Sequence, residues 1–150
     1  MIEDEKRSGI RLDEVLMFFP VLFKNFIDHI FSYLDDDTPR IHIGVLLVLK
    51  KHGAMPISRI GEILSVAKPN MTPIIKTLIK KGWITGIPQT DRRIKTIEPT
   101  QAGLDYINGI ISRLEGIVAQ RFACLSPGEA DEFMKSLNTL IFLGNKVITS

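Results

Sequence analysis

Apolar residues recur at helical spacing near both ends of the chain. The first run predicts a helix over residues 11–34, which Pro20 should bend or divide. The last run follows a capping box, residues 126–129, and predicts a helix with apolar residues on one side as far as Ile148. Both stripes are wider than the core of one small domain requires. The excess apolar surface therefore predicts a partner subunit.

Shorter helices are expected in the middle of the chain. Thr38 is predicted to cap a helix that starts at Pro39 and ends before Gly53. Residues 56–64 and 68–81 predict two helices separated by a three-residue turn. The second is apolar on one side and basic on its outer side, which is the pattern of a helix-turn-helix.

A hairpin and a further helix complete the order of elements. Two short β-prone stretches, 83–88 and 94–97, lie on either side of a charged turn, and Thr100 caps a helix over residues 101–123. We therefore predict a mainly α fold with a small β-hairpin wing. In it a winged helix-turn-helix lobe, residues 38–100, is flanked by dimerisation helices in residues 1–37 and 101–150 of a single 150-residue domain.

Charge is distributed unevenly over these segments. Residues 38–100 carry 11 basic and three acidic side chains, a net charge of +8. The same count gives −5 for residues 1–37 and −1 for residues 101–150. The predicted lobe is thus a place where a polyanion could bind, although a solvated basic face is the alternative that charge alone leaves open.

Several classes of protein are not expected. No stretch is apolar enough to span a membrane, and the acidic start lacks the layout of a signal peptide. A lone cysteine, Cys124, fits a reducing cytoplasm. The motifs of hydrolases, zinc peptidases and phosphate-binding loops are absent, and no His or Cys cluster has metal-ligand spacing. Neither an enzyme, a cofactor nor a metal site is therefore expected, and the acidic run 35–37 is interpreted as a solvated helix end.

Residues 55–103 resemble the DNA-binding core of the MarR family of bacterial transcriptional regulators. The matching features are Ile60-Gly61, the segment "AKPNMTPIIKTL", Gly82-Trp83-Ile84, the wing triplet Asp91-Arg92-Arg93, and Pro99-Thr100-Gln101-Ala102-Gly103. The chain departs from the family pattern at Thr85-Gly86, where an arginine is frequent, at Pro99, which replaces leucine, and at Pro73 inside the recognition helix.

The resemblance implies a homodimer that binds double-stranded DNA at a near-palindromic operator, with two winged helices in successive major grooves. It further implies a transcriptional regulator, expected to be a repressor, that a small-molecule effector releases from DNA. Two alternatives remain: a winged-helix module that binds another protein, and a redox-sensing regulator that acts through Cys124.

Candidate DNA contacts lie on the recognition helix and the wing. Asn, Thr and Lys side chains can reach base edges or phosphates from a helix in the groove. The candidates are Lys68, Asn70, Thr72, Lys76, Thr77, Lys80, Asp91, Arg92 and Arg93. Arg93 matches the family's wing arginine and is assigned to the minor groove, Asp91 to orienting it, and Arg92 to phosphate or solvent. Lys80 and the neighbouring Lys81 are expected to contact phosphates, or only to complement the C-terminal end of the helix.

Effector binding is predicted at His29, Tyr33 and His42, because these lie on the first two helices, where ligands of the family often bind. The alternative interpretation is that they are polar residues of a core or interface with satisfied hydrogen bonds.

Overall fold

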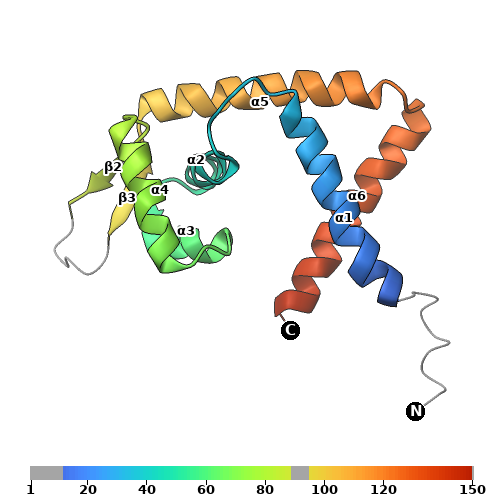
Figure 1. Ribbon diagram of the computed structural model, residues 1–150, viewed down its shortest axis with the longest axis horizontal. Helices are drawn as coiled ribbons and strands as arrows, with labels where there is room; N and C mark the ends of the chain where they lie inside the picture. Colours follow the sequence, from blue (N-terminus) through green and yellow to red (C-terminus); the bar gives the residue numbers. More distant parts are fainter. Residues whose placement is uncertain (1–11, 89–94, 150) are drawn as a thin grey trace, which may run out of the picture. The chain divides into compact units, whose positions relative to one another are not determined.

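The computed structural model describes residues 12–88 and 95–149 (Figure 1). The chain divides into two compact units. The terminal unit contains the chain up to Tyr33 and from Leu114 onward, and the central unit is Leu34–Arg113. The described part is mainly helical with one small antiparallel sheet, so the predicted fold class is confirmed. The central unit also includes the first half of a long helix that the sequence analysis placed with the dimerisation helices.

The terminal unit is built from α1 (Leu12–Ser32), the end of α5 (Gln101–Phe122) and α6 (Pro127–Thr149). Phe26 of α1 contacts Phe122 and Phe133, and these two rings also meet edge to face at 5.0 Å. The aromatic cluster thus joins all three helices. α1 runs through Pro20 as one helix, so a division there is wrong.

The capping box at the start of α6 is confirmed. The Ser126 N–H donates to Glu129 Oε2 at 2.8 Å, and the Glu129 N–H donates to Ser126 Oγ at 3.3 Å. Hydrogen bonds from the backbone and hydroxyl of Ser126 also lower the pKa of Glu129 below its usual value. Pro127 occupies the first helical position, where its missing N–H costs nothing.

Ser126→Ala should lower the free energy of unfolding by about 1 kcal/mol, because the first turn of α6 loses a hydrogen-bond acceptor. Urea denaturation of the variant and the wild type measures the difference. An unchanged midpoint would show that α6 does not depend on this cap.

The central unit contains a three-stranded sheet in the order β1–β3–β2. Strands β2 and β3 of this sheet are labelled in Figure 1. The elements of the unit are α2 (Arg40–His52), β1 (Met55–Pro56), α3 (Ile57–Ile63), α4 (Lys68–Lys80), β2 (Ile84–Ile87), β3 (Thr96–Pro99) and the start of α5. Met55 pairs with Ile97, and Ile87 pairs with Thr96. The sequence did not predict β1, since two residues are too few to show alternation, and it placed the second wing strand two residues early.

The hydrophobic core of this unit draws on every one of its helices and on two strands. Its most buried side chains come from α2, α3, α4, the hairpin and α5: Ile43, Val45, Leu46, Leu49, Ile60, Met71, Leu78, Ile84, Ile97, Ile107 and Ile110. Most apolar positions of the predicted helix-turn-helix therefore face inward, but the expectation is wrong for Ile63 and Ile79, which are 42% and 49% exposed.

The turn between α3 and α4 requires a close approach of the backbone. A side chain at Gly61 would place its Cβ 3.0 Å from the Val66 carbonyl oxygen, and the Val66 N–H already donates to Gly61. Ser65 adopts a left-handed conformation with φ of 53° to make the reversal. The turn thus holds α4 at a fixed angle to α3.

The start of α2 differs from the prediction. Pro39, not Thr38, is the N-cap residue, and no side chain caps this helix. The Thr38 hydroxyl instead accepts a hydrogen bond from Lys81 at the end of α4. Gly53, with φ of 74°, ends α2 as predicted.

Candidate nucleic-acid interface

The recognition helix α4 borders a hollow of about 1140 Å³ that it shares with α3 and the wing strands. Lys68, Thr72 and Lys76, spaced four residues apart on α4, line it. Gly86 and Ile87 of β2 and Lys95 before β3 also line it. Three of the six candidates on the helix therefore share one edge of a concave surface with the base of the wing.

The other three candidates occupy different sides of α4. Lys80 is exposed in its last turn. Asn70 and Thr77 are seven residues apart and so share one flank of the helix, and neither lines the hollow. The Thr77 hydroxyl donates to the Pro73 carbonyl oxygen at 3.0 Å, four residues back in the helix. That bond occupies the hydroxyl hydrogen of Thr77 within α4.

The edge of the hollow is basic. Lys68, Lys76 and Lys95 are exposed, and none of them forms an ion pair with another residue in the part of the chain that the structure describes. The acidic side chain that lines the hollow, Glu62, is paired with Arg59 at 2.7 Å. Uncompensated ammonium groups beside a groove favour a polyanionic partner.

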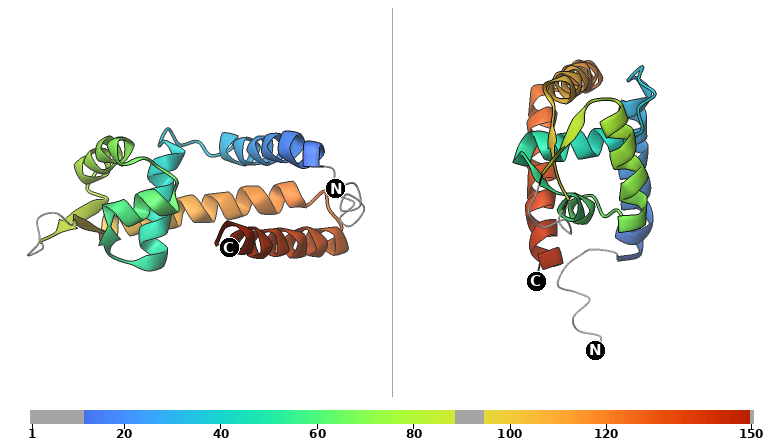
Figure 2. Two further views of the ribbon diagram at one scale, coloured as in Figure 1. Left: turned by 90° about the horizontal axis from the view of Figure 1, so that it is seen from below. Right: turned by 90° about the vertical axis from the view of Figure 1, so that its left-hand side faces the viewer.

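The wing residues Asp91, Arg92 and Arg93 lie outside the described residues. The strands that lead to them are described: β2 ends at Ile87, β3 begins at Thr96, and these two residues are paired. Figure 2 shows the two strands side by side. The roles assigned to the three wing residues stay predictions.

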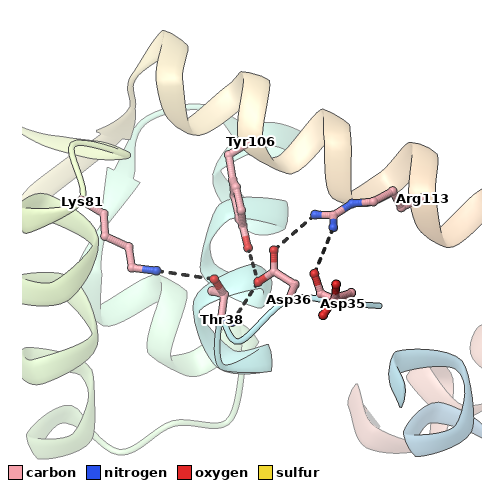
Figure 3. Close-up of polar contacts among 6 residues, drawn as sticks. All are labelled: Asp35, Asp36, Thr38, Lys81, Tyr106 and Arg113. Carbon is pink, nitrogen blue, oxygen red and sulfur yellow. Dashed lines mark hydrogen bonds and ion pairs between the residues drawn. The ribbon is translucent and has the colours of Figure 1, made fainter. Parts of the chain in front are cut away.

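A polar network joins the segment that precedes α2 to α5 (Figure 3). Asp36 Oδ1 accepts hydrogen bonds from the Thr38 N–H at 2.8 Å and from the Tyr106 hydroxyl at 2.9 Å. Arg113 pairs with Asp36 Oδ2 at 3.2 Å and donates to the Asp35 carbonyl oxygen at 3.3 Å. The interpretation of residues 35–37 as a solvated helix end is therefore wrong for Asp36, whose side chain is 13% exposed.

Hydrogen bonding determines the charge of Asp36. Burial favours the neutral acid, but the hydrogen bonds from Thr38, Tyr106 and Arg113 outweigh it and lower the pKa of Asp36. Burial, together with the Asp36 carboxylate, raises the pKa of Tyr106, so the phenol remains a donor. Sequence reasoning missed this network because Asp36 and Tyr106 are 70 residues apart in the chain. The one local signal was an aspartate two residues before Thr38, a spacing that indicates a turn and not a long-range partner.

Lys81 belongs to the same region. Its ammonium lies 3.5 Å from the Thr38 hydroxyl and 4.3 Å from the centre of the Trp83 ring. Trp83 stacks on Tyr106 with ring centres 3.8 Å apart. Lys81 follows the last residue of α4 and is exposed like Lys80, but its ammonium is directed to Thr38 and Trp83.

The predicted effector residues are found in both units. In the terminal unit His29 and Tyr33 contact each other edge to face, and Arg121 stacks over Tyr33 at 3.7 Å. In the central unit His42 is 8% exposed, and its Nδ1 has no hydrogen-bond partner among the described residues. Burial lowers the pKa of His42, and the charge of Lys81 lowers it further. His42 is thus a neutral, enclosed imidazole.

Two further features concern the alternatives. Cys124 is exposed after the end of α5, and its thiol donates to the Arg121 carbonyl oxygen at 3.1 Å.

Over residues 12–88 and 95–149, no three His, Cys, Asp or Glu side chains gather as metal ligands would. Within the same residues no helix combines the length and apolar character that crossing a membrane requires.

Comparison with known proteins found one matching family and many solved structures with a similar fold. A model of the MarR family matches residues 42–95. No curated protein sequence matches the chain. The fold is similar to a probable transcriptional regulator from Pseudomonas aeruginosa, with 20% identity over 87% of this chain and 99% of that one and a TM-score of 0.68.

Two other solved structures are similar at comparable distance. RV1404 from Mycobacterium tuberculosis shares 15% identity over 91% of this chain and 97% of its own, with a TM-score of 0.75. BpsR from Bordetella bronchiseptica shares 16% sequence identity over 81% of this chain and 97% of its own, with a TM-score of 0.65. The DNA binding of BpsR is described as regulated by 6-hydroxynicotinic acid. At these identities the likeness shows a common fold.

Proposed function

Residues 42–95 of this chain belong to the MarR family, and from that premise we propose that the protein binds double-stranded DNA as a homodimer. Regulators of this family are in general transcription factors and not enzymes. The observation that carries the proposal is the basic edge of the hollow beside α4. There Lys68, Thr72 and Lys76 share the hollow with the base of the wing, and Glu62, the acidic side chain among the described residues that line it, is already paired.

The proposed contacts divide into two kinds. Lys68, Thr72 and Lys76 border the hollow together, so they are the residues we assign to the major groove and its phosphates. Arg93 and Arg92, which the sequence predicts to lie at the tip of the wing, are assigned to the adjacent minor groove and backbone. Asn70 and Thr77 lie on the other flank of α4 and should contribute less, although the sequence analysis ranked them with the other candidates.

A second copy of the chain is the proposed partner of the terminal unit. α1 and α6 expose large apolar side chains to solvent, among them Leu22, Phe142 and Val147. An exposed apolar surface on two helices favours an interface that buries it. Two copies would present two winged helices to one operator, which we expect to be near-palindromic.

Lys76→Ala should weaken binding to all DNA sequences by a similar factor and reduce the slope of log affinity against log salt by about one, because it removes one phosphate contact.

Arg93→Ala should weaken operator binding and relax the preference for A·T pairs beside each half-site. Fluorescence anisotropy on an operator selected from random DNA, at several salt concentrations, measures both effects.

Lys135→Ala, an exposed lysine on α6, is the matched control and should leave affinity unchanged. Equal, sequence-independent losses in Arg92→Ala and Arg93→Ala would show that the wing holds only the DNA backbone. A wild-type protein without salt-dependent DNA binding would favour the alternative, a module that binds another protein.

We further propose that a small molecule regulates DNA binding, as the BpsR structure describes for that protein. The contact between His29 and Tyr33 offers one edge-to-face pair of polar aromatic rings to a ligand. His42 is enclosed and would have to be reached through a rearrangement. Mass spectrometry of the purified protein under native conditions would identify a retained ligand, and alanine variants at these three residues would test where it binds.

A further inference from the structure

We propose that Asp36 is a positioning residue for DNA binding, which acts through Tyr106, Trp83 and Lys81 on the C-terminal end of the recognition helix α4. The inference rests on the proposed function, because the position of α4 matters to an activity only if α4 contacts DNA. None of these four side chains needs to touch the nucleic acid.

The first step joins the segment before α2 to α5. Both carboxylate oxygens of Asp36 are engaged, one by Thr38 and Tyr106 and the other by Arg113 (Figure 3). Because the Asp36 side chain is 13% exposed, water competes poorly for these hydrogen bonds. Removal of the carboxylate would leave Arg113 and the Tyr106 hydroxyl without their partner.

The second step joins α5 to the end of α4. Tyr106 stacks on Trp83, with ring planes only 16° apart. The Trp83 N–H donates to the Leu78 carbonyl oxygen of α4 at 3.0 Å, and the Trp83 carbonyl oxygen accepts from the Thr100 N–H before α5 at 3.0 Å. Trp83 is therefore held by both helices, and a shift of Tyr106 reaches α4 through it.

The third step returns to the segment before α2. Lys81 lies over the indole of Trp83 and within 3.5 Å of the Thr38 hydroxyl, and the Thr38 N–H is bound to Asp36. The contacts therefore form a closed circuit through Asp36, Tyr106, Trp83, Lys81 and Thr38. A closed circuit restrains the end of α4 from two sides, whereas a single contact would allow it to pivot.

This circuit gives adjacent lysines different roles. Lys80 is exposed, and no ion pair joins it to any of the described residues, so its charge is available to a phosphate. Lys81 is also exposed, but its ammonium lies over the Trp83 ring and 3.5 Å from the Thr38 hydroxyl, so it has partners within the protein. The sequence alone treats the two as equivalent.

Trp83 is the only tryptophan of the chain, so its fluorescence reports on the circuit directly. Asp36→Asn keeps the size of the side chain but removes the charge that holds Arg113. We expect a changed Trp83 emission spectrum and operator affinity about tenfold weaker, the effect of losing charge-assisted hydrogen bonds. The salt slope should not change, because no phosphate contact is lost. Asp37→Asn, one residue further and exposed, is the matched control and should alter neither quantity.

The lysine pair separates positioning from phosphate contact. Lys80→Met should reduce the salt slope by about one and leave Trp83 emission unchanged. Lys81→Met should change the emission and weaken binding at an unchanged slope. A reduced slope in Lys81→Met, with the emission of the wild type, would overturn the role assigned to Lys81.

Tyr106→Phe covers the case in which Asp36→Asn does not fold, because it retains the stack on Trp83 and removes one hydrogen bond. A smaller change in the same direction supports the proposal. Wild-type emission and affinity in either folded variant overturn it. The two failures are distinguishable, since a wild-type protein that binds no DNA refutes the proposed function itself, while the emission of Asp36→Asn still shows whether the circuit exists.

Discussion

Phe142→Glu on α6 should convert the protein from a dimer to a monomer and weaken operator binding on the order of 10³-fold. Phe142 is 71% exposed in the isolated chain, and Ile141, Leu143 and Val147 beside it are also exposed. A carboxylate in the middle of a buried apolar interface would lose its hydration without gaining a partner. A monomer presents one winged helix instead of two, so it loses half of the base and phosphate contacts. The expected loss lies at the low end of the usual ratio between specific and non-specific binding.

Sedimentation velocity at micromolar concentration measures the first effect and anisotropy titration the second. Gln120→Glu adds the same charge at an exposed polar position of α5 and should remain dimeric. A wild-type protein that sediments near 17 kDa, or a Phe142→Glu variant that remains a dimer, would show that this surface of α6 is not the interface.

Local sequence patterns predicted most of the helical framework. The apolar spacing of α4 identified its buried side correctly, because Met71, Ile74, Ile75 and Leu78 have no alternative to the core once the helix forms. Caps at Ser126 and Thr100 were equally predictable, since a cap depends on residues three positions apart. The candidate contacts on α4 also follow from this pattern, because the buried side defines the exposed one.

Long-range pairing could not be predicted in the same way. β1 is a strand only because Met55 and Pro56 lie beside β3, some 40 residues away. Threonine is a residue type that often caps helices. The Thr38 hydroxyl nevertheless accepts a hydrogen bond from Lys81, and the Thr38 N–H donates to Asp36. Both errors have one physical origin: a tertiary partner competed with the local preference and won.

The hollow beside α4 illustrates the same limit for the site. The sequence analysis proposed six residues on the recognition helix and set only Lys80 apart from the others, as a phosphate contact. In the structure, one flank of α4 shares the hollow with the wing and the other flank does not. This difference depends on where β2 and β3 lie. The position of these strands depends on the packing of the whole central unit. Which candidates on α4 line the hollow therefore could not be predicted from the sequence of the helix alone.

Gly103→Ala should lower the free energy of unfolding by about 3 kcal/mol, although alanine ordinarily stabilises a helix. Gly103 is buried in the first turn of α5, directly against Trp83. A Cβ at this position would overlap the Trp83 carbonyl oxygen and lie 2.9 Å from its carbonyl carbon. The neighbour is backbone, so it cannot rotate away as a flexible side chain could.

The surrounding hydrogen bonds make the junction rigid. Thr100 donates its N–H to the Trp83 carbonyl oxygen at 3.0 Å and its hydroxyl to the Gly82 carbonyl oxygen at 2.6 Å. The Gly103 N–H in turn donates to the Thr100 hydroxyl at 3.1 Å. To admit a methyl group, α5 must move away from Trp83 and break at least one of these bonds.

Gly109→Ala is the matched control on the same helix. Nothing lies within 4 Å of a Cβ built at Gly109, so only the helix propensity changes, and the variant should gain about 0.5–1 kcal/mol. Urea denaturation of both variants therefore tests a difference of sign between two identical substitutions. If both variants are stabilised, the backbone of Trp83 yields to the methyl group, and the close approach of α5 is not what requires glycine at position 103.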